Sequence, residues 1–240
     1  EMALAFAGEG ANIVVAEISA PAAEAVAKEI KALGRKALAV PTDVTSEKEV
    51  NQMVQKALNE FGRIDILVNN VGIGFGAHPA RVPLKDLELK YWKSVLDTNL
   101  TSMFLCAKAA LPQMIKQRSG SIINITSGLG KRGRPSLGAY CVSKFGVEGL
   151  TQVLAAESKP FGLRANALSP GAAVITESVK KLPYVDPSEP LLNPDVIRQA
   201  AVYLASDESV DVNGQSITAL AWNEQHGLGG YEKWKAIWKV

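Results

Sequence analysis

The sequence predicts an α/β protein built on a doubly wound parallel sheet, with helices on both faces. The first observation is that short apolar runs of strand length alternate with longer segments whose apolar residues recur at helical spacing. The second is that these runs, such as ANIVVAEI at residues 11–18, are apolar almost throughout, as strands buried on both faces are. The third is size, because 240 residues with 47% hydrophobic content supply one large core, so we expect residues 1–240 to form a single domain.

The amino-terminal part of the chain predicts two units of strand and helix. Residues 1–10 are Ala-rich and end at Gly8 or Gly10, which is typical of the last turns of a helix. Ser46 begins the run Ser-Glu-Lys-Glu, the pattern of a capping box at a helix start. The elements expected here are the end of a helix at 1–10, a strand at 11–18, a helix at 20–33, a strand at 36–40 and a helix at 46–62.

The rest of the chain continues the alternation. A helix over residues 89–117 is expected to bend near Asn99, and Asn193, followed by a proline and an acid, has the pattern of a helix N-cap. The other expected elements are strands at 64–68, 121–125, 163–168 and 215–219, helices at 138–161 and 193–206, and an irregular Pro-rich stretch at 169–193.

Charge, hydropathy and cysteine content exclude several classes of function. The chain carries 26 basic and 24 acidic residues, a formal net charge of +2, so we expect no nucleic-acid partner. No apolar run approaches the length that crosses a bilayer, so we expect no membrane partner. Cys106 and Cys141 are too few for a disulfide framework, which favours a cytoplasmic location. His78 and His226 have no cysteine or acid at ligand spacing, so we predict no metal site.

Tyr140 and Lys144 lie four residues apart in the predicted helix at 138–161, so one helical turn places a phenol and an ammonium on the same face. A lysine beside a tyrosine favours the phenolate and lowers the tyrosine pKa from about 10 toward working pH, as a general acid/base requires. Alone the pair is a weak indication, because this spacing is more often a solvated pair on a helix surface.

Polar residues and glycines follow the predicted strands, at the edge of the sheet where doubly wound folds bind ligands. Their recurrence at every strand end predicts a binding site there. They are Glu17, Asp43-Val44, residues 69–72, Thr126-Ser127 and Pro170-Gly171.

With these residues in place, the sequence resembles the short-chain dehydrogenase/reductase family in its single-domain form, which has a Rossmann-like fold and an Asn-Ser-Tyr-Lys tetrad. The motifs occur in the family's order across most of the chain, and together they are specific. They are DILVNNVG at residues 65–72, Asn99 in DTNLTSMF, Ser127 in NITSG, Tyr140-x-x-x-Lys144, and SPG at residues 169–171.

The resemblance implies a role for each member of the tetrad. Tyr140 would exchange a proton with the substrate oxygen, and the Ser127 hydroxyl would hold that oxygen. Lys144 would lower the pKa of Tyr140 and bind the nicotinamide ribose. Asn99 would place a water that links Lys144 to solvent; the alternative is a polar residue that satisfies backbone groups at the helix bend.

The resemblance also implies the cofactor site. Glu17 is suited to accept both hydroxyls of an adenosine ribose and would repel a 2′-phosphate, so NAD(H) is predicted over NADP(H). Thr176 would contact the carboxamide, although it lies one residue later than the threonine usual in the family. The other expected contacts are Asp43 and Val44 at the adenine, Asn70, Val71 and Gly72 at the adenosine ribose, Tyr140 and Lys144 at the nicotinamide ribose, and Pro170 and Gly171 at the nicotinamide.

Two departures from the family stand out. The first strand and the Gly-rich turn that receives the cofactor pyrophosphate are absent from residues 1–240, so we expect an amino-terminally incomplete domain whose missing strand belongs between those at 11–18 and 64–68. After the last strand, residues 219–223 read ALAWN where relatives commonly have Asp-Gly-Gly, which changes the pocket floor or a subunit contact. The tail beyond them predicts a helix with Tyr231, Trp234 and Trp238 on one face.

Three functions remain open from the sequence. The first is an NAD(H)-dependent oxidoreductase acting on a secondary alcohol or ketone, with polyols and sugars as candidates. The second is a 3-oxoacyl-thioester reductase, and the third is a pseudoenzyme or oligomeric scaffold. Subunits are expected to meet through the helices that begin at Leu89 and Gly138, giving a homodimer or homotetramer, and specificity is expected in the loops at 74–82, 128–137 and 171–190.

Overall fold

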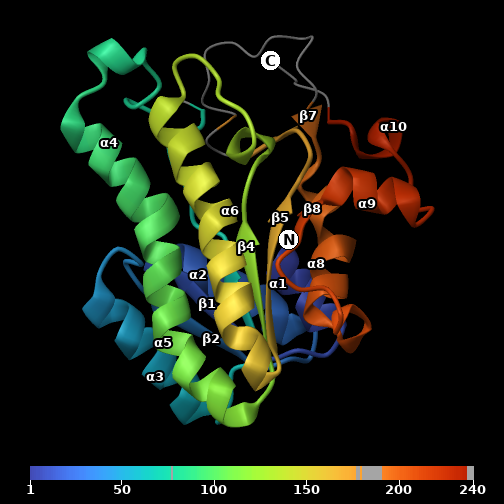
Figure 1. Cartoon of the computed structure of the whole chain (residues 1–240). Helices are drawn as coiled ribbons and strands as arrows, with labels where there is room; N and C mark the ends of the chain where they lie inside the picture. Colours follow the sequence, from blue (N-terminus) through green and yellow to red (C-terminus); the bar gives the residue numbers. More distant parts are fainter. Residues whose placement is uncertain (77, 177–178, 180–190, 237–240) are drawn as a thin grey trace.

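A parallel sheet in two parts forms the centre of the computed structural model, which describes residues 1–76, 78–176, 179 and 191–236 (Figure 1). The larger part has the strand order β3-β4-β5-β8, and β1 pairs with β2 in the smaller part. The strands are β1 (Ile13–Glu17), β2 (Ala37–Pro41), β3 (Ile66–Asn69), β4 (Gly120–Ile125), β5 (Leu163–Ser169) and β8 (Ser216–Thr218), with a separate parallel pair β6 (Ala173–Val174) and β7 (Leu191–Leu192). The predicted α/β fold with a parallel sheet is confirmed.

Helices cover both faces of the sheet. On one face α5 and α6 bury apolar side chains against β4 and β5, and α3 packs beside α5 against β1, β2 and β3; on the other face α1 and α8 pack against β4 and β5. Ser46 caps the amino end of α3, and its Oγ accepts a hydrogen bond from Glu49 N as the capping pattern predicts. The helices are α1 (Met2–Gly8), α2 (Ala20–Ala32), α3 (Glu47–Phe61), α4 (Leu89–Leu96), α5 (Ser102–Gln117), α6 (Gly138–Ser158), α8 (Arg198–Ala205), α9 (Ala219–Gln225) and α10 (Tyr231–Trp234).

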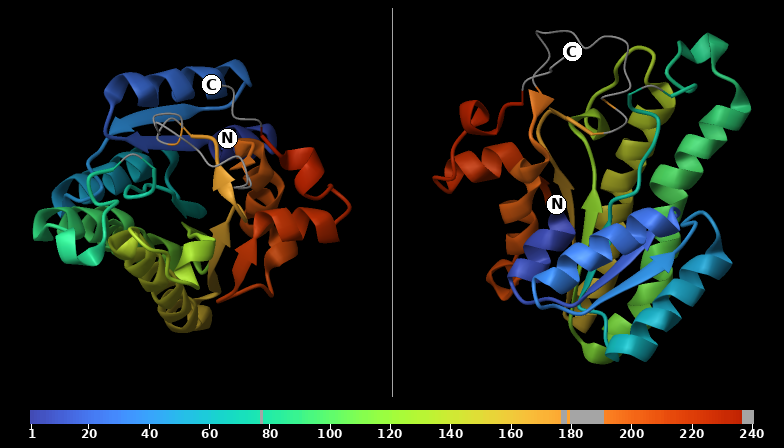
Figure 2. Two further views of the ribbon diagram at one scale, coloured as in Figure 1. Left: turned by 90° about the horizontal axis from the view of Figure 1, so that it is seen from above. Right: turned by 180° about the vertical axis from the view of Figure 1, so that it is seen from behind.

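The two parts of the sheet face each other through β1 and β3, which are not hydrogen-bonded to one another within the described chain. Both strands contribute side chains to the same two apolar clusters: Ile13 and Ile66 to one, Val14 and Leu67 to the other. All residues of β1 are only partly buried, whereas every residue of β4 and β5 is buried. Figure 2 shows β1 and β2, in blue, set apart from the larger sheet. This break lies where the sequence predicts the missing strand.

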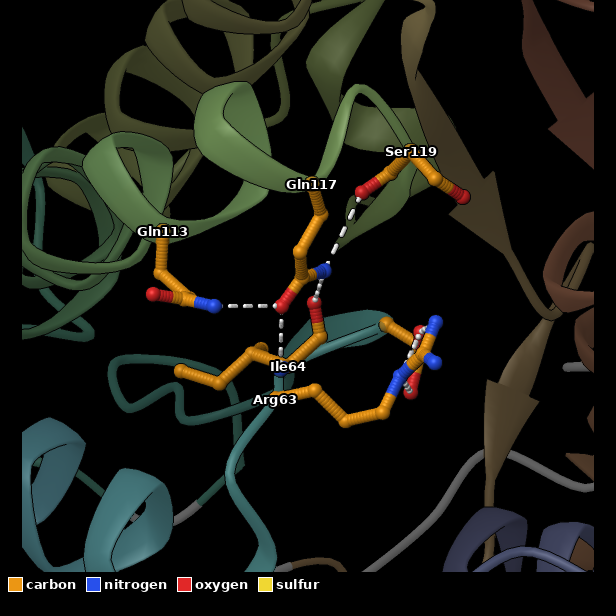
Figure 3. Close-up of polar contacts among 6 residues, drawn as sticks. Arg63, Ile64, Gln113, Gln117 and Ser119 are labelled. Carbon is orange, nitrogen blue, oxygen red and sulfur yellow. Dashed lines mark hydrogen bonds and ion pairs between the residues drawn. The ribbon is translucent and has the colours of Figure 1, made fainter.

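A glutamine joins the end of α5 to the amino end of β3. Gln117 Oε1 accepts hydrogen bonds from Ile64 N at 3.0 Å and Gln113 Nε2 at 2.9 Å, and Gln117 Nε2 donates to Ile64 O at 2.7 Å (Figure 3). The side-chain amide thus satisfies both backbone groups of Ile64, as a neighbouring strand would. This contact fixes the long helical segment that carries Asn99 relative to the sheet.

The structure adds detail to some local expectations and corrects others. The segment predicted as a helix bent near Asn99 contains a π-helical turn, Asp97–Thr101, between α4 and α5. The stretch predicted as irregular contains β6 and β7, and residues 219–223 begin α9. Within residues 230–236 of the tail only α10 is helical, because the next residue, Lys235, has extended backbone and forms a bridge to Leu192; Trp238 lies outside the described residues. Within the part of the chain that is described, no helix is both long and apolar enough to span a bilayer.

Candidate active site

Lys144 is buried early in α6 and points at the end of β4. The residue is 3% exposed, and its Nζ donates a hydrogen bond of 2.8 Å to Ile125 O. Because burial disfavours the charged ammonium, the pKa of Lys144 is lowered to about 8. The Nζ lies 5.8 Å from the centroid of the Tyr140 ring. A buried amine with this pKa can gain or lose a proton beside the phenol near working pH.

Ser127 is the second residue after β4, and its side chain lies next to Tyr140. Its Oγ accepts a hydrogen bond of 3.2 Å from Leu129 N in the 3-10 turn Gly128–Gly130. Its side chain is also hydrogen-bonded to the Tyr140 hydroxyl. Burial raises the pKa of Tyr140 above its ordinary value, and the bond with Ser127 acts in the opposite direction. The raised pKa of Tyr140 is opposite in direction to the lowered pKa expected from Lys144. Removal of the phenol from water is the largest influence on this pKa.

Asn99 lies in the π-helical turn and is fully buried. Its Oδ1 accepts from Ile73 N at 2.8 Å, and its Nδ2 donates to Ile73 O at 2.9 Å and to Ser143 Oγ at 3.0 Å. Ser143 Oγ donates in turn to Tyr140 O at 2.7 Å. Asn99 therefore ties the loop after β3 to α6, in line with the alternative of a polar residue that satisfies backbone.

Apolar side chains surround one side of the tyrosine. The rings of Phe75 and Tyr140 lie 5.5 Å apart at an interplanar angle of 48°. Leu129, Leu137 and Cys141 form a buried cluster against which both rings pack. Cys141 is a packed residue in this cluster. This cluster explains the desolvation that raises the pKa of Tyr140.

The geometry brings Ser127, Tyr140, Lys144 and, through Ser143, Asn99 to one end of the sheet. The profile of the family described as short chain dehydrogenase matches residues 1–184. The chain belongs to the short chain dehydrogenase family. It is accordingly an oxidoreductase, and its relatives are NAD(P)-dependent dehydrogenases and reductases.

Relatives of this dehydrogenase carry several names. A 3-oxoacyl-[acyl-carrier-protein] reductase of a Synechocystis species is 39% identical over 220 residues, covering 89% of this chain and 87% of the relative. The enzyme of the same name from Thermotoga maritima is 36% identical over 222 residues, covering 89% of this chain and 88% of the relative. Among solved structures, an NAD+-bound xylitol dehydrogenase has a TM-score of 0.81 at 29% identity, covering 90% of this chain and 91% of that one. A 7α-hydroxysteroid dehydrogenase complexed with NADH has a TM-score of 0.83 at 31% identity, covering 90% and 86%.

Two glycines of this dehydrogenase at predicted cofactor contacts lie close to other residues of the site. A Cβ added to Gly72 would lie 3.6 Å from Asn99 Oδ1 and 3.7 Å from Lys144 Nζ. Gly171 has a φ of +109°, and a Cβ there would meet Leu220 Cβ at 2.9 Å. Leu220 belongs to the segment that departs from the family, and its N donates to Pro170 O at 3.1 Å. The segment at residues 219–223 therefore packs against Pro170 and Gly171.

The remaining predicted cofactor residues are more scattered. Glu17 ends β1, and its Oε1 accepts a hydrogen bond of 3.1 Å from Ser19 N. Asp43 follows β2, and its Oδ1 accepts from the N and Oγ1 of Thr45, which lowers the pKa of Asp43. Thr176 Oγ1 accepts a hydrogen bond of 3.4 Å from Val179 N. Asn70 and Val71 are exposed after β3, and Val44 packs in the apolar cluster between β2 and α3. Within the described residues, no group of three or more potential ligands forms a metal site.

Sequence reasoning missed a buried polar ladder behind the site. Asn69 Nδ2 donates to Asn124 Oδ1 at 2.8 Å, and Asn124 Nδ2 donates to Thr151 Oγ1 at 2.9 Å. The ladder connects β3, β4 and α6 across the sheet face. Its signal is a polar residue inside an apolar strand, as Asn124 is in SIINI, because a buried amide requires partners. Ser143 was missed for a different reason, since its role depends on Asn99, which is distant in sequence.

Proposed function

We propose that this dehydrogenase transfers a hydride between NAD(H) and a secondary alcohol or ketone, with polyols and sugars as candidate substrates. The observation that carries the proposal is the Tyr140 hydroxyl, which is hydrogen-bonded to Ser127, together with the buried Lys144 Nζ at 5.8 Å from the centroid of the Tyr140 ring. A bound nicotinamide supplies or accepts the hydride. The chain's own residues must then move a proton to or from the substrate oxygen.

Tyr140 is the proposed acid/base for that proton. In the direction of reduction, the phenol gives its proton to the carbonyl oxygen as the oxygen gains charge, and Ser127 Oγ holds the same oxygen by a hydrogen bond. An ammonium has three donors, and Lys144 uses one on Ile125 O, so two are available for the Tyr140 oxygen and a ribose hydroxyl. In the oxidative direction each proton transfer reverses. A screen of alcohols with NAD+ tests the proposal: we expect turnover that Tyr140→Phe lowers by about 10³-fold, and no turnover would favour the scaffold hypothesis.

Glu17 supports NAD(H) over NADP(H). Its carboxylate lies at the end of β1, where a 2′-phosphate would meet a like charge. We expect Glu17→Gln to reduce the preference for NAD over NADP by about 10-fold, measured as the ratio of kcat/KM values. Glu24→Gln, an exposed change on α2, is the matched control and should leave the ratio unchanged. A wild-type preference for NADP would contradict the assignment.

A 3-oxoacyl-thioester reductase is the second candidate. The named reductases at 39% and 36% identity favour it. Lys131 and Arg132 are exposed in the loop between Ser127 and Tyr140, and thioester carriers bear phosphate groups that cations bind. Turnover of a β-ketoacyl thioester at higher kcat/KM than any free alcohol or ketone would replace the first candidate with this one.

A homodimer or homotetramer and a cytoplasmic location are also proposed. Subunits are expected to meet at the helical segment that begins at Leu89, which includes α4 and α5, and at α6. Exposed apolar side chains lie on α5 and α6, and a second copy would remove them from water. Both cysteines are free and buried, which suits a reducing compartment. We expect Phe145→Glu to give a smaller species than the wild type in sedimentation velocity. The exposed apolar residues are Phe104, Val142, Phe145 and Val153.

A further inference from the structure

Glu148 lies one helical turn beyond Lys144 and two turns beyond Tyr140 on α6, so the three side chains stack along one face of the helix. Its Oε1 accepts a hydrogen bond of 2.9 Å from Thr126 Oγ1 and another of 3.0 Å from Ser216 Oγ. Thr126 follows β4, and Ser216 begins β8. One carboxylate oxygen on α6 therefore joins the two strands that flank β5.

Thr126 is the residue directly before Ser127. It is 3% exposed, and its N donates to Leu168 O at 2.9 Å, so its backbone is fixed to β5 while its side chain is fixed to α6. The turn after Ser127 packs against the same place, because a Cβ added to Gly130 would lie 3.0 Å from Thr126 Oγ1 and 2.9 Å from Lys144 O. The position of Ser127 is thus coupled to that of α6 through its immediate neighbour.

Other contacts between α6 and β4 act further down the strand. Lys144 Nζ binds Ile125 O, and Thr151 Oγ1 accepts from Asn124 Nδ2. Glu148 is the side chain that reaches the residue adjoining Ser127. A hydrogen bond to a carboxylate is stronger than one between neutral groups, which suits it to set a distance.

We propose that Glu148 is a positioning residue for the dehydrogenase reaction: its carboxylate sets the position of α6 relative to the end of β4, and thereby the distance between the Tyr140 hydroxyl and Ser127 Oγ. The inference rests on one part of the proposed function, namely that Tyr140 and Ser127 bind the substrate oxygen. Glu148 itself touches neither substrate nor cofactor. Among the described residues, the charged group that faces the Tyr140 ring is Lys144, and a substitution at Glu148 does not remove that group.

Four variants test the role of Glu148. Glu148→Ala removes both hydrogen bonds, whereas Glu148→Gln keeps an oxygen that can accept them. Thr126→Val removes only the bond next to Ser127, with little change in shape. Glu157→Ala, an exposed change on the same helix, is the matched control.

We expect Glu148→Ala and Thr126→Val each to lower kcat by about 10-fold, because small misplacements of reacting groups are costly. The KM for the cofactor should stay within about twofold, since its contacts are not altered. Glu148→Gln should retain most of the activity, and Glu157→Ala all of it. The apparent pKa of the kcat profile should rise in Glu148→Ala, because the bond from Ser127 lowers the pKa of Tyr140.

Crystal structures of the wild type and of Glu148→Ala supply a readout that needs no turnover, the distance from Tyr140 Oη to Ser127 Oγ. A longer distance in the variant supports positioning even if the wild type turns over no alcohol, a result that would overturn the proposed function alone. An unchanged distance, or a kcat equal to that of Glu157→Ala, overturns the inference. If Glu148→Ala does not fold, Thr126→Val decides by the same two measurements.

Discussion

The amino and carboxyl ends of the parallel sheet both carry polar side chains, but the two sets have different partners. At the amino end, Gln117 satisfies both backbone groups of Ile64, and Arg164 donates to Ser206 O at 2.7 Å beyond the carboxyl terminus of α8. At the carboxyl end, Lys144 and Ser127 make bonds to the protein and keep further hydrogen-bonding capacity. The amino end uses its polar groups to stabilise the fold, and the carboxyl end holds groups ready for a ligand.

The comparison implies that substitutions at the two ends separate activity from stability. A polar group at the carboxyl end that loses water without gaining enough hydrogen bonds lowers the free energy of unfolding, but it contributes to activity. A group at the amino end that is bonded to backbone contributes folding free energy and no chemistry.

Tyr140→Phe should produce the largest effect. The variant loses the proposed acid/base and keeps the ring that packs against Phe75. We expect kcat/KM to fall by about 10³-fold, with Tm close to that of the wild type because the apolar contacts remain. Steady-state kinetics and a thermal melt measure the two quantities. Activity within tenfold of the wild type would show that another group supplies the proton.

Lys144→Met should separate the two properties most clearly. We expect kcat/KM to fall by about 100-fold, because the proposed partner of Tyr140 is lost. Without cofactor at about pH 7, the variant should be more stable by about 1–2 kcal/mol, since a buried ammonium is replaced by an apolar side chain while Ile125 O loses its donor.

The pH dependence follows from the direction of the Lys144 shift. Its pKa is about 8 in the folded protein and higher in the unfolded chain, so between these values the unfolded chain binds more protons. The free energy of unfolding of the wild type is therefore reduced below about pH 8. It recovers as the pH rises toward the pKa that Lys144 has in the unfolded chain. The advantage of Lys144→Met should shrink over that range in denaturant titrations, with Lys159→Met as the exposed control. An advantage independent of pH would show that burial of the charge is not its cause.

The sequence predicted the main strands better than the local details. Alternating apolar runs and helical stripes identified all six strands of the main sheet, because burial on both faces leaves a clear pattern in residues such as those of β4. The short strands β6 and β7 and helix α9 were missed, since two-residue strands carry no period and α9 depends on packing under Gly171.

At the site, the members of the tetrad were predicted but the forces on them were not. Motif spacing places Ser127, Tyr140 and Lys144 together, and the structure does so. The raised pKa of Tyr140 depends on Phe75 and the apolar cluster, which assemble from loops whose contacts no local pattern reveals. The bonds of Asn99 to Ile73 likewise arise from a π-helical turn that sequence alone does not distinguish from a bend.

Gln117→Ala tests the amino end and should have the smallest effect on activity. The change leaves both Ile64 backbone groups without the side chain that satisfies them (Figure 3). We expect a loss of about 1–2 kcal/mol in the free energy of unfolding, with kcat/KM within twofold of the wild type, since the site lies at the other end of the sheet. Gln55→Ala is the matched control, because Gln55 is exposed and bonded only to Asn59 in the described structure, and should cost less than about 0.5 kcal/mol. A fall in kcat at unchanged stability would mean that Gln117 acts on the site through α5 and Asn99, and the separation of the two ends would then fail.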